Sequence, residues 1–86
     1  MRNWVSSPAY LVAVEMLAEA RRSSGLTQRA VEEALGKGYH GWLAKIERGE
    51  RQANVIDMIA ILRVVSADER AFFQELLTRL PPDLTV

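Results

Sequence analysis

Residues that could do chemistry are sparse in this chain, which limits the sites it could build. There is one histidine, His40, and no cysteine. A disulfide framework, a thiolate zinc site and a cluster of imidazole ligands are therefore excluded. His40 has no obvious nucleophile partner, and the sequence holds no glycine-rich phosphate loop. We therefore expect neither an enzyme nor a bound cofactor or metal.

Basic side chains are concentrated in the middle of the chain. The whole sequence balances 11 Lys and Arg against 11 Asp and Glu, for a formal net charge of zero. Residues 21–52 nevertheless hold seven basic and four acidic side chains, which gives this segment a charge of +3 and leaves −3 for the remainder. This separation predicts a basic face on a neutral protein, which would steer an anionic partner.

Length and composition indicate an ordinary small globular protein. The 86 residues are 49% hydrophobic and 26% charged, so we expect a single domain over residues 1–86 with one packed core. No uninterrupted apolar run approaches the roughly 20 residues that cross a membrane. We therefore expect a soluble intracellular protein.

The spacing of apolar residues predicts an all-α fold. They recur every three to four positions, and no alternating strand pattern is found. Ser7 and Pro8 begin a first helix over about 8–23, because a hydroxyl caps free amides and proline tolerates the first helical position. Thr27 caps a second helix of about eight residues, which Gly36 ends.

Three further helices are predicted after short turns. The first of them covers residues 39–48. Asn54 caps the next helix. Ser66 caps the last one, because Glu69 three residues later completes a capping-box pattern. The total is five helices.

Two short helices joined by a glycine-containing turn are typical of a helix-turn-helix unit. The chain resembles the phage repressor and Cro-type family labelled XRE over roughly residues 10–66. The matching runs are Leu26-Thr27-Gln28, Ala34-Leu35-Gly36, Ala44 to Arg51 and Asn54-Val55-Ile56-Asp57. The most specific part is Lys45 to Arg51. The resemblance implies a five-helix lambda-repressor-like domain with a core of about 8–66, followed by a helix of about 67–80.

The function implied by this resemblance is sequence-specific binding of double-stranded DNA by a transcriptional repressor. Helix 39–48 would lie in the major groove of each half-site, in a cytoplasmic protein acting on bacterial or phage DNA. The side chains or backbone that would read base edges belong to Tyr39, His40, Gly41 and Lys45. The residues that would contact the DNA backbone are Thr27, Gln28, Lys37, Arg48, Arg51 and Gln52.

Two residues of helix 39–48 have structural interpretations instead. Trp42 is expected to fill the crevice against a neighbouring helix rather than to stack on DNA. A carboxylate at Glu47 would cost energy beside phosphates unless a cation neutralised it. The resemblance implies an arginine near the end of the first helix as its partner, and of Arg21 and Arg22 we expect Arg21 to form the ion pair.

Three features depart from the family's pattern. The chain has one additional residue before helix 39–48, placed in the Lys37-Gly38 turn or at Gly41. Ala53 replaces a frequent proline, which should only soften the turn. Glu32 stands where a small residue is usual, and a charge there would be costly unless the second helix is rotated so that other residues supply the contact: Ala30, Val31 and Ala34.

Apolar residues outside the resemblance predict a protein interface. We expect homodimerisation through the last helix, because such proteins read palindromic or repeated half-sites about one turn apart. The interface would comprise Phe72, Phe73, Leu76, Leu77 and Leu80. Alternatively, Phe72 and Leu76 cap the core, while Phe73 and Leu77 pack against an N-terminal arm that contains Trp4. Two other functions stay open: a protein-interaction module of antitoxin-like or adaptor type, and a DNA binder active only in a hetero-oligomer with another regulator.

Overall fold

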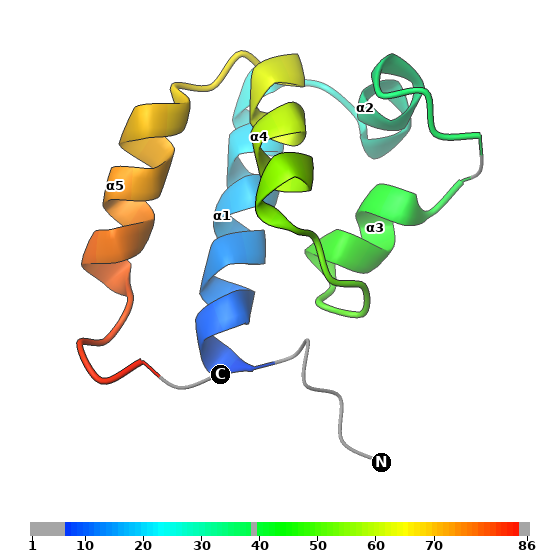
Figure 1. Cartoon of the computed structure of the whole chain (residues 1–86). Coiled ribbons are helices and arrows are strands. Elements are labelled where there is room, and N and C mark those ends of the chain that lie inside the picture. Colours follow the sequence, from blue (N-terminus) through cyan, green and yellow to red (C-terminus); the bar gives the residue numbers. More distant parts are fainter. Residues whose placement is uncertain (1–6, 39, 85–86) are drawn as a thin grey trace.

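Five helices make up the regular structure of residues 7–38 and 40–84, which the computed structural model describes (Figure 1). No strand occurs within those ranges, so the predicted all-α class is confirmed. The helices are α1 (Pro8–Ser24), α2 (Gln28–Ala34), α3 (Trp42–Glu47), α4 (Val55–Val64) and α5 (Glu69–Arg79). None of them is long and apolar enough to cross a membrane.

Helix α1 lies at the centre of the helix packing. It packs against α3, α4 and α5, whereas α2 packs against α3 and α4. Helix α5 lies on one side of α1, and α2 and α3 lie on the opposite side (Figure 1). The two shortest helices are therefore stabilised by tertiary contact, because helices of six or seven residues are not stable alone in water.

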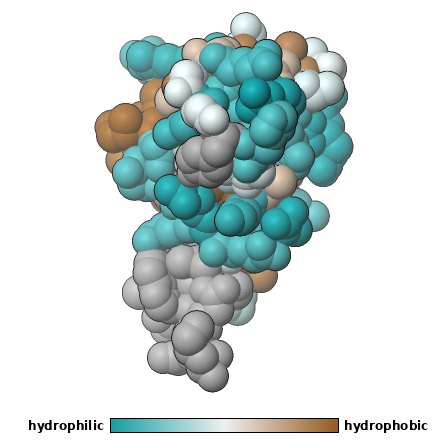
Figure 2. Space-filling view, turned by 90° about the vertical axis from the view of Figure 1, so that its right-hand side faces the viewer, coloured by the Kyte–Doolittle hydropathy of each residue, from teal (hydrophilic) through white to brown (hydrophobic). Residues whose placement is uncertain are grey.

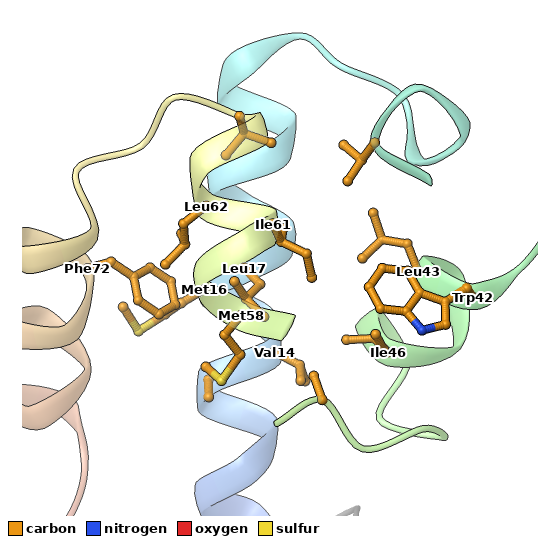
Figure 3. Close-up of a cluster of buried hydrophobic side chains, with 14 residues drawn as sticks. Val14, Met16, Leu17, Trp42, Leu43, Ile46, Met58, Ile61, Leu62 and Phe72 are labelled. Atoms are coloured by element: carbon orange, nitrogen blue, oxygen red, sulfur yellow. The ribbon is translucent and has the colours of Figure 1, made fainter. Parts of the chain in front are cut away.

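The hydrophobic core lies where α1, α3 and α4 meet (Figure 3). Its fully buried side chains are Val14, Leu17, Val31, Leu43, Ile46, Ile61 and Leu62. Burial of each such Leu or Ile contributes roughly 1.5–3 kcal/mol. Trp42 is only 3% exposed and joins this cluster from α3, so the expectation that it packs is confirmed.

Capping side chains begin α1, α2 and α4 where the sequence predicts. The Ser7 hydroxyl accepts a hydrogen bond from the Tyr10 amide, and the Thr27 hydroxyl accepts one from the Ala30 amide. Asn54 and Asp57 form a complete capping box at α4. These local hydrogen bonds satisfy amides that have no partner inside the helix.

The prediction of a helix over 39–48 is wrong at its N-terminal end. Helix α3 begins at Trp42, because Gly41 precedes it with a φ of 92°, in the left-handed region that favours glycine. A right-handed helix cannot extend back through that residue. His40 therefore lies in a turn, and Tyr39 lies outside the described residues.

The predicted cap of α5 is also wrong. Asp68 caps this helix by accepting a hydrogen bond from the Ala71 amide. Ser66 instead follows the end of α4 with a φ of 60°, and its amide donates to the Arg63 carbonyl at 3.2 Å. The predicted Glu69 partner pairs instead with Arg63, at 2.6 Å.

Most of the predicted dimer interface faces the interior. Phe72 is buried, and Phe73 and Leu76 pack against the core, as the intramolecular alternative expects for Phe72 and Leu76. Leu80 is half-buried, and Leu77 is 74% exposed. Trp4 lies outside the described residues. Only Leu77 thus remains as a fully solvent-facing residue of that set.

Replacement of Ser66 by glycine should stabilise the protein. A left-handed serine costs energy that glycine avoids, so we expect Ser66→Gly to raise the free energy of unfolding by about 0.5 to 1 kcal/mol. Ser23→Gly is the matched control. It lies in the last turn of α1 with a right-handed backbone, where glycine should lower stability slightly. Urea denaturation of both variants checks the opposite signs, and destabilisation by Ser66→Gly would contradict the argument.

Candidate nucleic-acid interface

An ion pair joins the C-terminal ends of α1 and α3. Arg21 Nε lies 2.7 Å from Glu47 Oε2, and Arg21 Nη2 donates to Glu47 Oε1 at 3.2 Å. The two side chains are only 13% and 8% exposed. The structure thus brings together the two residues that the sequence pairs, in the two-pronged geometry that strengthens arginine–carboxylate bonds.

Two further hydrogen bonds extend this ion pair to the start of α2. Arg21 Nη1 donates to the Leu26 carbonyl at 2.9 Å, and Gln28 Nε2 donates to Glu47 Oε1 at 2.8 Å. Gln28 was predicted to contact the DNA backbone, but its amide is engaged within the protein. Its contribution in this arrangement is to orient Glu47.

Glu32 caps the N-terminus of α3 from the neighbouring helix. Gly41 occupies the N-cap position and offers no side chain. Glu32 Oε2 instead accepts a hydrogen bond from the Leu43 amide at 2.9 Å. A carboxylate is favourable there because helix amides point toward it. The carboxylate therefore performs the task that a serine or aspartate at the N-cap would normally perform.

A rotation of α2 that would keep Glu32 out of the contact with α3 does not occur. Glu32 is 2% exposed and faces α3, whereas Ala34 is exposed. Val31 is fully buried beside it, as expected. Arg29 partly offsets the buried charge, with Nη1 3.7 Å from Glu32 Oε1. That same nitrogen is buried and has no hydrogen-bond partner.

Lys37 lies on the indole ring of Trp42. Its Nζ is 4.3 Å from the ring centroid, within the range of cation–π attraction. Lys37 was predicted to contact the DNA backbone. The structure gives its charge a protein partner that ties the turn after α2 to the start of α3.

Exposed cations follow the outer side of α3 and the loop after it. Lys45, Arg48 and Arg51 are all exposed, and the Arg51 amide donates to the Lys45 carbonyl at 3.2 Å, which folds the loop back onto the helix. The side of the molecule that carries α2 and α3 is mostly hydrophilic (Figure 2). Thr27, His40 and Gln52 are exposed as well.

Glu50 reduces the positive charge of this surface. Arg48 Nε and Nη2 donate to its two carboxylate oxygens at 2.9 and 3.0 Å. The hydrogen bond from Arg48 lowers the pKa of Glu50, and the same bond raises the pKa of Arg48. Both groups are therefore charged at neutral pH, and Glu50 offsets part of the positive charge of Arg48. The charge of Lys45 also contributes to the lowered pKa of Glu50.

Two groups that position this surface were missed at the level of sequence. The sequence showed Glu32 only as a charge at an unusual position, and its role as the cap of α3 was not predicted. Tyr10, in the first turn of α1, was not predicted to contact this loop. Its hydroxyl nevertheless forms hydrogen bonds with the backbone of Arg51 and Ala53. Neither interaction follows from spacing, because each joins elements distant along the chain.

Comparison with protein families, with curated proteins and with solved structures finds no match for this chain. The assignment of a function therefore depends on the geometry described above and on the motif resemblance.

Removal of Arg21 should destabilise the fold. Arg21→Ala leaves the mostly enclosed Glu47 carboxylate beside Gln28 without a cation, so we expect a loss of about 2 to 3 kcal/mol in the free energy of unfolding. Arg22→Ala is the matched control, since Arg22 is exposed and should change stability by less than about 0.5 kcal/mol. Chemical denaturation measures both. Equal stability of the two variants would refute the importance of the ion pair.

Substitution of Glu32 tests the cap of α3. Glu32→Ala leaves the buried Leu43 amide without an acceptor, which should cost about 2 kcal/mol. Glu32→Gln keeps an acceptor oxygen and should cost less. Glu33→Ala is the control, because Glu33 is exposed and pairs only with Arg29 at the surface. A thermal melt in which Glu32→Ala resembles Glu33→Ala would exclude the cap.

Proposed function

We propose that this protein is a sequence-specific double-stranded DNA-binding regulator of transcription, a repressor, and that α3 enters the major groove as the second helix of a helix-turn-helix unit formed with α2. Its site for DNA is the surface of Lys45, Arg48, Arg51 and Gln52. The operator would contain palindromic or repeated half-sites bound by two copies of the chain.

The observation that carries this proposal is the division of α3 into two faces. Trp42, Leu43 and Ile46 are buried in the core, and Lys45 is exposed between them along the helix. A lysine on the outer face can donate to guanine O6 and N7. The resemblance of Lys45 to Arg51 to the XRE pattern adds the expectation that the following loop contacts phosphates.

Rigid attachment of α3 supports the same proposal. The helix is fixed at its start by Glu32 and at its end by Arg21. A reading helix must present its side chains in a fixed register, because each good contact to a base edge depends on its geometry. These two attachments support the proposal because they hold both ends of α3 in place.

The revised start of α3 changes which residues are proposed to read bases. Lys45 keeps this role. His40 and Gly41 precede the helix, so they would approach the groove from the turn rather than from the first helical turn. Thr27 is proposed to contact a phosphate while capping α2, whereas Gln28 and Lys37 act through their protein partners.

A protein-interaction module is the second candidate function. It is favoured by apolar side chains that face solvent on α4 and α5, among them Ile56 at 68% and Leu77 at 74% exposure, and by the partial neutralisation of Arg48. The same experiment separates the two functions, because a protein-interaction module has no preference among DNA sequences.

Selection of bound sequences from a random duplex pool tests the proposal. The winning duplex is then titrated beside a scrambled control at two salt concentrations. A symmetric or repeated site bound at least about a thousandfold more tightly than the control would support a sequence reader. Absence of enrichment, with affinity that does not change with salt, would reject DNA binding in favour of a protein partner.

Lys45 and Arg51 should respond differently to removal. We expect Lys45→Ala to weaken the selected duplex by about 1 to 3 kcal/mol and to relax specificity at one base position. Arg51→Ala should weaken all duplexes alike and reduce the dependence of affinity on salt. Binding measured on selected and scrambled DNA checks this. Identical profiles of the two variants would contradict the proposed division between base and phosphate contacts.

A further inference from the structure

The loop after α3 has a tether to α1 that its own sequence does not provide. The Tyr10 hydroxyl donates to the Arg51 carbonyl at 3.0 Å and accepts from the Ala53 amide at 2.7 Å. These bonds cross 41 and 43 positions of the chain. One phenol oxygen thereby holds the backbone on both sides of Gln52.

The rest of the loop is held from other directions. The amides of Gly49, Glu50 and Arg51 donate to carbonyls of α3, and the Asn54 amide donates to Asp57 at the start of α4. Between these two anchored regions, the Tyr10 hydroxyl fixes the segment that carries the exposed side chains of Arg51 and Gln52. A proline at position 53 would have no N–H for this bond.

Tyr10 is itself well placed to restrain the loop. It lies in the first turn of α1, and its own amide donates to the Ser7 hydroxyl at 3.3 Å. Burial raises the pKa of the Tyr10 hydroxyl above its ordinary value of 10.0; the Ala53 hydrogen bond lowers it, and the charge of Asp57 raises it. The hydroxyl therefore keeps its proton at neutral pH and can donate to the Arg51 carbonyl.

We propose that Tyr10 is a positioning residue for DNA binding, which acts by holding the backbone of residues 51–53 so that Arg51 and Gln52 are presented to phosphates. Tyr10 need not touch DNA for this role. The inference rests on the proposed function, because it assigns a purpose to the loop only if the loop contacts a nucleic acid. Without the phenol oxygen, the loop would have to be ordered at the moment of binding.

Substitution by phenylalanine tests this role, because it removes the oxygen and keeps the ring. The probe is a labelled duplex of mixed sequence of about 20 base pairs, which covers two helical turns. We expect Tyr10→Phe to lower affinity about tenfold, the equivalent of ordering the backbone of roughly one residue. The control is Thr78→Val, which removes the hydroxyl that donates to the Gln74 carbonyl at 3.1 Å on α5.

A double mutant separates positioning from a general loss of stability. If Tyr10 acts through the loop, its substitution should cost less than about threefold in an Arg51→Ala background, because interacting residues are not additive. A full tenfold loss in both backgrounds would overturn the inference. So would equal affinity of Tyr10→Phe and the unsubstituted protein. Addition of Ser66→Gly to every variant offsets any loss of stability that hinders folding.

Hydrogen exchange of backbone amides in the free protein tests the same hydrogen bond without DNA. The Ala53 amide should exchange faster with solvent in Tyr10→Phe, and unchanged exchange would show that the hydroxyl does not hold the loop. If the unsubstituted protein binds no duplex at all, the proposed function fails and this inference fails with it. If the protein binds and Tyr10→Phe binds equally well, only the inference fails.

Discussion

The largely enclosed ion pair of Arg21 and Glu47 is the interaction on which the arrangement of α2, α3 and the loop after α3 depends. It fixes the end of α3 to the end of α1, and Gln28 brings the start of α2 to the same carboxylate. Helix α3 has six residues, too few to be stable without such contacts. An ion pair this well enclosed needs hydrogen bonds on its remaining donors and acceptors to offset the loss of hydration. The Leu26 carbonyl and the Gln28 amide provide them.

Cations that look equivalent in the sequence have separate tasks in the fold. Arg21 forms an ion pair with Glu47, and Lys37 lies over the ring of Trp42. Lys45 and Arg51 are exposed at the surface, as is Arg48, which pairs with Glu50. The basic segment therefore presents fewer available charges than its composition indicates.

Sequence reasoning succeeds here where the determining forces are local or repeated. Apolar spacing predicts the five helices, and the Arg21–Glu47 pair follows from the motif resemblance. It fails where one backbone angle decides the outcome, as at Gly41 and Ser66, because the spacing of apolar residues is the same for either conformation. It also fails at Glu32 and Tyr10. Their partners lie on other elements, and a buried charge or a phenol can be placed only when those elements are packed.

The cap that Glu32 provides restricts substitution at two positions of the chain. A side chain at position 41 would be strained by the left-handed φ of 92° and so could not replace the Glu32 carboxylate as the acceptor of the Leu43 amide. Conversely, a small residue at position 32 would leave Gly41 unable to begin the helix favourably. Each single exchange gives a less stable protein. Substitutions at positions 32 and 41 are therefore coupled through the start of α3.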